Sequence, residues 1–349
     1  MTDHCPSIKF VDFPDKNDYC FLDAMTLVSQ PYILEKDHLG RPQHGGVGCM
    51  ANVYIVDICD YLFPAFSHKE ESQNRTTGQS SSAKQEPPPP PQRLLVQFGD
   101  VREQFPYPVF VKTRLAKRME RDDYDPILAP LEMTRHFLDP LGHLENAKPD
   151  RPWENKTNSL VWRGASTGGR LAILHAFAER FGLKGEKRNS SSLTNAIDIG
   201  FTYLSYVDSE SEEEYEHLLV DALSIESHLS HKYILNLEGN DVSTGLKWML
   251  LSNSVVFSPI PTCVSWAMEE LLVPWYHYIP LRDDIMDIFD KIQWCMAHDA
   301  ECQQISRHAT QYMMDLWMSE QARRDHKLVL EKIMSKYDVY GKMLQECIA

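Results

Sequence analysis

The chain has 349 residues, enough for one large or two medium domains, and its 43% hydrophobic and 24% charged residues are ordinary for a globular protein. Its formal net charge of −15 argues against a general nucleic-acid or anionic-membrane binder, because neutralising phosphates needs a basic face. The eight cysteines are scattered and form no Cys-x-x-Cys pair, which argues against a structural zinc site.

The N-terminal segment shows neither the basic nor the apolar region of a signal peptide, and no apolar run in the chain reaches the length of a membrane span. From the sequence we therefore expect a cytoplasmic protein, or one of the secretory pathway if the sequence is trimmed. Residues 67–93 are of low complexity and include five consecutive prolines. This composition predicts a disordered insertion with an extended polyproline segment, because it offers too little apolar surface to bury.

Two short apolar runs after this insertion predict strands. The run at residues 94–98 leads into Gly99-Asp100, and a carboxylate just past a strand occupies a position that catalytic groups often have in α/β proteins. A turn is the more frequent role of a Gly-Asp pair, so the pattern alone favours a turn. The run at residues 108–114 ends in a cation, Arg114.

Two further polar groups follow these strands. Asp123 and Asp125 form a D-x-D triplet, which in some sugar transferases holds a divalent metal, but they lie in a charge-rich stretch typical of a solvated loop. Arg135 and the adjacent His136 form a candidate site pair, although a lone histidine near an apolar helix face is more often structural. The histidines form no H-E-x-x-H motif, so metal catalysis is not indicated.

The first strand–loop–helix unit begins at residues 159–161. They lead into Trp162-Arg163-Gly164-Ala165-Ser166-Thr167-Gly168-Gly169-Arg170, and the apolar spacing after it predicts a helix. The glycines match neither a Walker A loop nor G-x-G-x-x-G, so on their own they are a weak signal. The two arginines favour an anion such as a diphosphate at the helix N-terminus, with a structural turn as the alternative.

The second unit has an apolar strand at residues 233–237, the loop Glu238-Gly239-Asn240-Asp241-Val242-Ser243-Thr244, and a helical pattern from residue 245. Glu238 is placed to accept from ribose hydroxyls, whereas Asp241 and Ser243 are more typical of helix caps. Loops at the carboxyl ends of parallel strands meet at one crevice. The two units therefore predict a polyanion site, with a nucleotide diphosphate as the first candidate.

The remaining pattern alternates strands and helices, which predicts a mainly parallel sheet. Residues 253–257 and 278–281 are predicted strands, and residues 285–292 have helical spacing. Residues 307–344 are predicted to be helical and contain no cluster that resembles a site.

Taken together, the motifs resemble glycosyltransferase family 90, which includes fungal capsule-associated transferases and protein O-glucosyl- and O-xylosyltransferases. The resemblance covers roughly residues 100–316, and the Glu-Gly-Asn-Asp-Val form is similar to the bacterial and viral or algal branch. It rests on Trp162-Arg163-Gly164 with Arg170, Lys232-Tyr233 before Glu238-Gly239-Asn240-Asp241-Val242-Ser243, Leu246-Lys247 before Ser252-Asn253-Ser254, and His277-Tyr278-Ile279-Pro280.

This resemblance implies an α/β, GT-B-like architecture with two Rossmann-type domains facing a central cleft. We expect an acceptor-side domain at residues 1–150, a UDP-sugar donor domain at 151–318 and a C-terminal helical segment at 319–349. The family implies an inverting, metal-independent transfer from a UDP-sugar, with xylose or glucose favoured, to a hydroxyl of a glycan or protein. We expect no cofactor, no nucleic-acid partner and no membrane span.

The resemblance also implies roles for individual residues. Asp100 would be the general base that takes the proton of the acceptor hydroxyl, and the loop cations and helix amides would stabilise the leaving UDP. Arg114 and Arg135 are further candidate cations of the active site, and Thr202 resembles the nucleobase contact. The candidate donor-binding residues are Arg163, Gly164, Ala165, Arg170, Thr202, Glu238, Asn240, Asp241, Val242, Ser243, Thr244 and Lys247.

One position departs from the family pattern. Many eukaryotic members have an arginine where this chain has Gly245, and its loss shifts the diphosphate contact to Arg163, Arg170 or Lys247. Two alternatives stay open: a metal-dependent transferase that uses the D-x-D triplet, and a non-catalytic nucleotide- or glycan-binding module.

Overall fold

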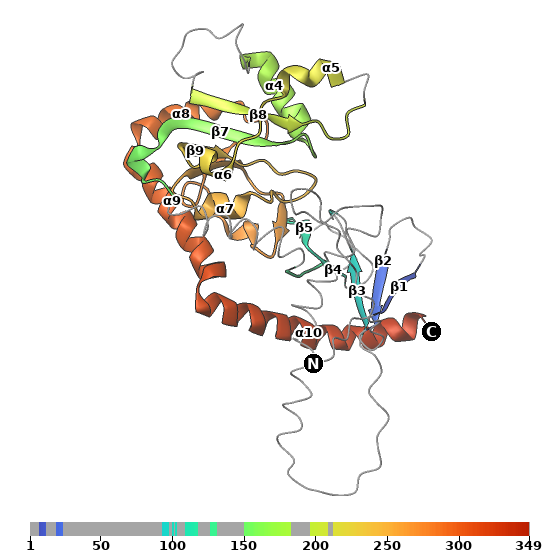
Figure 1. Cartoon of the computed structure of the whole chain (residues 1–349). Helices are drawn as coiled ribbons and strands as arrows, with labels where there is room; N and C mark the ends of the chain where they lie inside the picture. Colours follow the sequence, from blue (N-terminus) through green and yellow to red (C-terminus); the bar gives the residue numbers. More distant parts are fainter. Residues whose placement is uncertain are drawn as a thin grey trace, which may run out of the picture. The chain divides into compact units, whose positions relative to one another are not determined.

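The computed structural model describes residues 7–11, 19–23, 93–97, 100, 102, 109–117, 126–130, 150–182, 196–208 and 212–348 (Figure 1). The chain forms two compact units. Unit 1 comprises Met1–Arg114, Arg118–Glu132 and Arg323–Ala349, and unit 2 comprises Leu115–Lys117 and Met133–Ala322. Most of the predicted insertion, residues 67–92, lies outside the described residues, as do Asp123, Asp125 and Arg135.

Unit 1 contains a five-stranded sheet with the order β1-β2-β3-β4-β6. The first three strands pair antiparallel, and β4 and β6 extend the sheet in parallel. Strand β3 confirms the predicted strand near residue 94. The strands of this sheet are β1 (Ser7–Val11), β2 (Tyr19–Asp23), β3 (Arg93–Gln97), β4 (Phe110–Val111) and β6 (Ile127–Leu128).

The predicted strand at residues 108–114 is divided into β4 and β5 (Thr113–Leu115). The Phe110 side chain is fully buried, and its ring packs against Tyr337 with a centroid distance of 4.8 Å. Tyr337 belongs to α10 (Glu320–Ile348), so this helix contributes to the core of unit 1.

Unit 2 is built on a five-stranded sheet with the order β12-β10-β9-β7-β8, and all of its pairings are parallel. Its inner strands are runs of buried apolar side chains rather than alternating ones, as expected for a parallel sheet covered on both faces. The predicted parallel sheet and the α/β class are therefore confirmed. The strands are β7 (Thr157–Ala165), β8 (Ile197–Tyr203), β9 (His231–Leu235), β10 (Val255–Pro259) and β12 (Ile279–Leu281).

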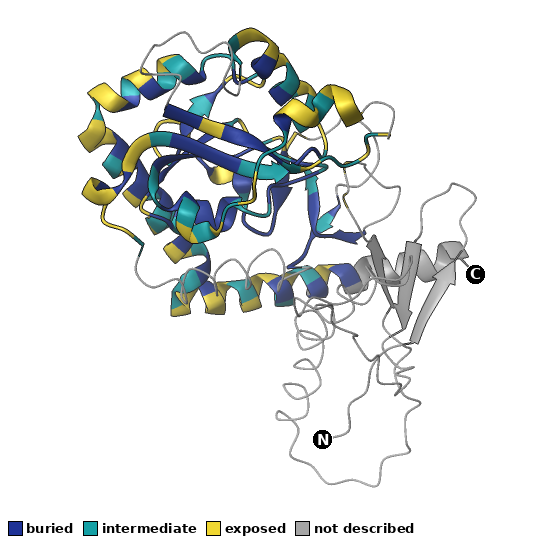
Figure 2. Ribbon diagram, turned by 45° about the horizontal axis from the view of Figure 1, so that its top comes forward, coloured by how far each residue is buried: buried dark blue, intermediate teal, exposed yellow. Residues whose placement is uncertain are grey.

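Helices cover both faces of this sheet (Figure 1). On one face α4 (Arg170–Phe181) packs against α8 (Ile288–Ala297), where the Phe177 and Phe289 rings stack at 5.9 Å. On the other face lie α6 (Ile225–His228) and α7 (Leu246–Leu251). Figure 2 shows strands that are mostly buried and helices whose exposed residues lie on their outer sides.

The C-terminal region is helical as predicted but is not continuous. Helix α9 (Asp299–Met313) passes into a π-helical turn, η7 (Met314–Met318), and the chain is extended at Ser319 before α10 begins. The Ser319 hydroxyl accepts from the N–H of Ala322 at 3.0 Å and so satisfies one of the unpaired donors of the new helix. None of the helices among the described residues is long and apolar enough to cross a membrane.

The remaining elements of unit 2 are short. They are η3 (Trp153–Asn155), α5 (Glu212–Tyr215), η5 (Glu216–Leu218), β11 (Cys263–Ser265) and η6 (Glu269–Leu271).

Candidate functional site

The first loop is shorter than the sequence pattern suggests, because β7 continues to Ala165. Arg163 is therefore a strand residue, and its Nη2 donates to both carboxylate oxygens of Asp198 on β8 at 2.9 and 2.8 Å. Its Nη1 donates to the carbonyls of Trp162 and Asp198, and its Nε donates to the carbonyl of Asp221. These bonds use all five N–H groups of the guanidinium, so Arg163 joins β7 to β8 and to the segment after η5.

The two predicted loops are in direct contact. Gly168 has a φ of 64°, and a Cβ there would lie 2.1 Å from the carbonyl oxygen of Gly239. Its N–H donates to the side-chain oxygen of Asn240 at 3.0 Å. Only glycine allows both this backbone conformation and this approach. Residues predicted from separate motifs thus meet at the carboxyl edge of the sheet.

Arg170, the first residue of α4, holds the two loops together. Its Nε donates to the carbonyl of Glu238 at 3.1 Å, and its Nη2 donates to the carbonyl of Leu237 at 2.6 Å. Its Nη1 donates within the first loop, to the Ala165 carbonyl and the Thr167 hydroxyl at 3.3 and 3.1 Å. Burial is the main cause that lowers the pKa of Arg170 from 12.5 to about 10, although nearby acidic groups oppose it. The guanidinium stays charged at neutral pH, but the nearby acidic groups only partly offset the cost of burying this charge.

The two helix N-termini at this edge differ. Helix α4 has 12 residues and follows Gly169, which provides no capping side chain. Helix α7 has only six residues and follows Gly245, so neither Asp241 nor Ser243 occupies its N-cap position. Because the helix dipole grows from aligned peptides, α4 is the helix that offers unpaired N–H groups and a partial positive charge to an anion.

Glu238 is engaged by the connection between β10 and β11. One carboxylate oxygen accepts from the N–H groups of Thr262 and Cys263 at 2.8 and 3.0 Å, and the other accepts from the Thr262 hydroxyl. A ribose hydroxyl would therefore have to share the carboxylate with these three donors. In this structure Glu238 holds the neighbouring turn against the second loop.

Lys247 lies in the interior of unit 2. Its Nζ is 3.3 Å from a carboxylate oxygen of Glu269, and both side chains are only 1% exposed. Glu269 also accepts from the N–H and the hydroxyl of Ser265, each at 2.7 Å. Within the second loop, Asp241, Val242 and Ser243 are buried as well, and Thr244 is half-buried.

Thr202 lies near the carboxyl end of β8, where its hydroxyl donates to the carbonyl of Gly164 at 3.4 Å. Beyond the strand, the N–H of Ser205 donates to the Ser166 hydroxyl at 2.6 Å, and this hydroxyl donates back to the Ser205 carbonyl at 3.0 Å. The sequence does not predict this link, because Ser205 lies outside both predicted loops although Ser166 lies inside the first. Two exposed tyrosines, Tyr203 and Tyr206, border the same edge.

Asp100 is an exposed residue of unit 1, and its carboxylate is 2.6 Å from Nζ of Lys112, whose side chain is 5% exposed. No motif in the sequence predicts a role for this lysine. Arg114 is half-buried on β5. Among the described residues, no group of three His, Cys, Asp or Glu side chains is arranged to hold a metal ion.

Comparisons with known proteins identify the family. A sequence model described as Glycosyl transferase family 90 matches residues 128–337, more than half of the chain. The chain is similar to O-glucosyltransferase LpsA of Dichelobacter nodosus, with 31% identity over 249 residues that cover 70% of this chain and 67% of that protein.

Two further relatives are more distant. The uncharacterized protein 179R of Invertebrate iridescent virus 6 is 28% identical over 190 residues, covering 46% of this chain and 15% of that protein. Protein O-glucosyltransferase 2 of Danio rerio is 26% identical over 197 residues, covering 55% of this chain and 36% of that protein. The chain thus spans well under half the length of these two relatives. The family match includes both loops and the clamp at Arg170, and the chain belongs to glycosyltransferase family 90.

Proposed function

We propose that the chain is a UDP-sugar-dependent glycosyltransferase that moves glucose or xylose to a hydroxyl of a glycan or protein acceptor. The observation that carries this proposal is the pair of loops joined by Arg170 at the N-terminus of α4. The similarity to O-glucosyltransferases of a bacterium and a fish favours glucose over xylose as the donor sugar.

The chemistry proposed for this edge is stabilisation of the leaving diphosphate. Negative charge develops on UDP as the glycosidic bond breaks, and preorganised N–H donors lower the energy of that charge. The amides that begin α4 and the partly compensated charge of Arg170 suit this role. The reaction we propose is inverting and metal-independent, on a GT-B-like architecture with the acceptor side in unit 1.

Asp100 is our candidate for the general base. An inverting transfer needs a base that takes the acceptor proton while the hydroxyl oxygen attacks the anomeric carbon. The carboxylate of Asp100 is exposed, and the buried Lys112 ammonium 2.6 Å away holds it in place and favours its ionised form. Lys112 thus serves as a positioning residue for Asp100.

One observation favours a second candidate, a non-catalytic nucleotide-binding module. Gly245 stands where we expect an arginine in many eukaryotic members of the family, and all N–H groups of Arg163 are bonded to protein atoms. This module would bind UDP without releasing sugar from UDP-sugars.

The experiment is a donor panel of UDP-glucose, UDP-xylose, UDP-galactose and UDP-N-acetylglucosamine, with and without EDTA. We expect sugar release or transfer from UDP-glucose or UDP-xylose that survives chelation and falls at least a hundredfold in Asp100→Asn. Calorimetric binding of UDP without turnover of any donor supports the binding module. Loss of all turnover in EDTA refutes the metal-free scheme, and full activity of Asp100→Asn removes Asp100 from the base role.

A further inference from the structure

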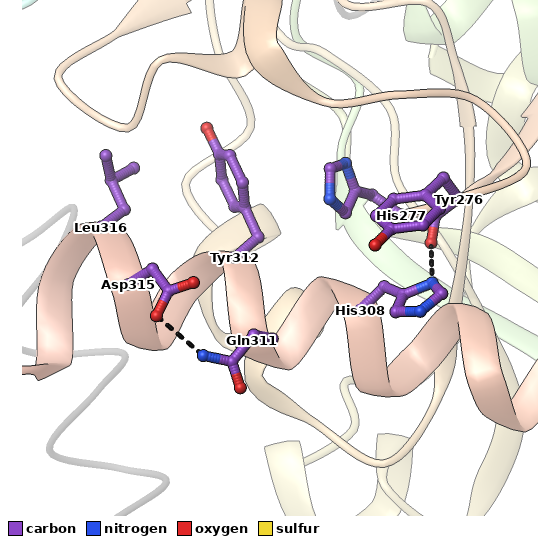
Figure 3. Close-up of a pocket in the computed structure, with 7 residues that line it drawn as sticks. All are labelled: Tyr276, His277, His308, Gln311, Tyr312, Asp315 and Leu316. Atoms are coloured by element: carbon purple, nitrogen blue, oxygen red, sulfur yellow. Dashed lines mark hydrogen bonds between the residues drawn. The ribbon is translucent and has the colours of Figure 1, made fainter.

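A hollow lies on unit 2, lined by residues of α9 and η7 and by the segment that precedes β12 (Figure 3). Because β12 begins at Ile279 and all strands of the sheet are parallel, this segment lies at the amino ends of the strands. The loops around Arg170 follow the carboxyl ends. The hollow therefore lies at the amino ends of the strands, and the proposed nucleotide site lies at their carboxyl ends. Its lining residues are Tyr276, His277, His308, Gln311, Tyr312, Asp315 and Leu316.

Aromatic rings form much of this pocket. The Tyr276 ring stacks on His308 with a centroid distance of 3.9 Å and an angle of 14° between the planes. The Tyr312 ring lies 5.2 Å from the His277 ring, and Figure 3 shows Tyr312 standing up from the helix beside it. The Tyr312 hydroxyl is directed to the carbonyls of Ala267 and Met268 at 2.6 and 2.8 Å. This fixes the ring, so Tyr312 offers a ligand its apolar body.

Polar groups accompany the rings. The Gln311 amide donates to Asp315 at 2.7 Å, which orients both side chains and leaves the amide oxygen and the second carboxylate oxygen as acceptors. His277 accepts from the N–H of Val273 through Nδ1 at 2.9 Å. Burial and the neighbouring His308 lower the pKa of His277, so the ring is neutral at pH 7 with its proton on Nε2. The pocket thus offers a ligand both hydrogen-bond acceptors and donors.

The charge of the pocket excludes one class of ligand. Its lining contains one carboxylate and no lysine or arginine, so a phosphate or a nucleotide would meet repulsion without a compensating cation. The cavity volume of 320 Å³ lies at the lower end of the range of about 300–1,000 Å³ that is typical of small-molecule sites. A small neutral ligand with several hydroxyls fits both properties.

The backbone around the pocket is unusual at two places. Asp315 and Leu316 lie in the π-helical turn η7, and such turns occur frequently at functional sites. Trp275 has a φ of 63°, which is rare for a bulky residue and is held by the bond from its N–H to the Tyr278 carbonyl at 2.8 Å. The strained segment presents Tyr276 and His277, and the π-helical turn presents Asp315.

We propose that this pocket is a saccharide subsite that binds a neutral sugar unit of the acceptor glycan, remote from the unit that receives the transferred sugar. A sugar ring has a face of polarised C–H groups that suits the electron-rich face of an aromatic ring, and hydroxyls at its edge that suit paired carboxylate and amide oxygens. Tyr276 and Tyr312 supply the rings, and Gln311 with Asp315 supplies the acceptors. This inference rests on the proposed function only in naming a glycan as the acceptor.

The test is saturation-transfer NMR on the full chain with methyl β-D-glucopyranoside, lactose and maltotriose as probes. We expect saturation transfer from the protein to the C–H protons of at least one probe. This signal should fall fivefold or more in Tyr276→Ala and in Asp315→Asn. The matched controls are Met296→Ala and Asp290→Asn, exposed residues of α8 that do not line the pocket. The controls should retain the signal of the unchanged chain.

Calorimetry with UDP on the same samples separates this inference from the proposed function. Both pocket variants should bind UDP as the unchanged chain does. If none of the three probes shows a saturation-transfer signal, or if the pocket and control variants give equal signals, the subsite is refuted and the transferase proposal is unaffected. An equal loss of saccharide and UDP binding in the pocket variants also refutes it, because it indicates a general structural defect. Saccharide binding that depends on the pocket in a chain that binds no UDP supports the subsite and counts against the transferase.

Discussion

Arg170→Met tests the idea that one guanidinium clamps the two loops. Methionine keeps an unbranched apolar stem that can pack against Trp162, whose ring centroid lies 5.5 Å from the guanidinium carbon. It removes the four bonds to Glu238, Leu237, Ala165 and Thr167. The carbonyls of Leu237 and Glu238 lie partly buried and lose these donors.

The magnitude follows from two opposing contributions. Bonds from a charged donor contribute about 1.5 kcal/mol each at the lower end of the usual range, so four contribute about 6 kcal/mol. The fall in the pKa of Arg170 from 12.5 to about 10 corresponds to about 3 kcal/mol of uncompensated burial, which the variant recovers. The net loss in the free energy of unfolding is therefore about 3 kcal/mol, which lowers Tm by roughly 6–12 °C.

Thermal and urea unfolding followed by circular dichroism measure this loss, and calorimetry measures the affinity for UDP. Arg180→Met is the matched control, because Arg180 lies exposed at the end of the same helix over the ring of Phe181. We expect the control to change stability by less than about 1 kcal/mol. If Arg170→Met costs no more than the control, the guanidinium does not clamp the loops. If it destabilises the fold yet leaves UDP affinity unchanged, the clamp stands and the diphosphate contact does not.

Three further predictions concern other residues. Gly168→Ala should cost about 2–4 kcal/mol of stability and weaken UDP binding, because φ is 64° and the new Cβ would lie 2.1 Å from the Gly239 carbonyl oxygen. The control Gly169→Ala has open space around it and should cost less than about 1 kcal/mol by thermal unfolding. Lys112→Met should move the acidic limb of the pH–rate profile to higher pH, because Asp100 loses the cation that favours its charged form; an unmoved limb argues against Asp100 as the base. Burial lowers the pKa of His228 below 6.5, so as the pH falls His228 is protonated in the unfolded chain before it is protonated in the folded chain, and stability should fall below about pH 6.5. His228→Gln should flatten this fall in Tm between pH 7 and 5.5, and an unchanged slope refutes the role of His228.

The fold of unit 2 could be predicted from the sequence because its signals are local. Strands β9 and β10 contain runs of consecutive buried apolar residues at 233–235 and 255–257, and the helix at 288–297 shows its spacing within two turns. The meeting of the two loops also follows from a general rule, since parallel strands place their carboxyl ends at one edge. The contact between Gly168 and Gly239 confirms that expectation.

Side-chain direction could not be predicted in the same way. The direction of Arg163 is decided by Asp198 and Asp221, which lie 35 and 58 residues further along the chain. The direction of Glu238 is likewise decided by Thr262, 24 residues away. Local motifs do not report such distant partners. The pocket on the opposite edge was missed for the same reason, because residues 276–277 and 308–316 form one site only after α8 and α9 have folded.

These contacts change which groups can hold a diphosphate in the described part of the chain. Gly245 stands where we expect an arginine in many eukaryotic members of the family, Arg163 is bonded to protein atoms through all of its N–H groups, and Lys247 lies buried against Glu269. Among the described residues, the groups left for the proposed diphosphate contact are Arg170 and the amides that begin α4. Amide dipoles carry partial charges and act at short range, so a site that depends on them is less sensitive to salt than one built from several full positive charges. A UDP affinity that falls only a few-fold between 50 and about 300 mM salt agrees with this balance, whereas a steep fall would mean that further cations reach the diphosphate.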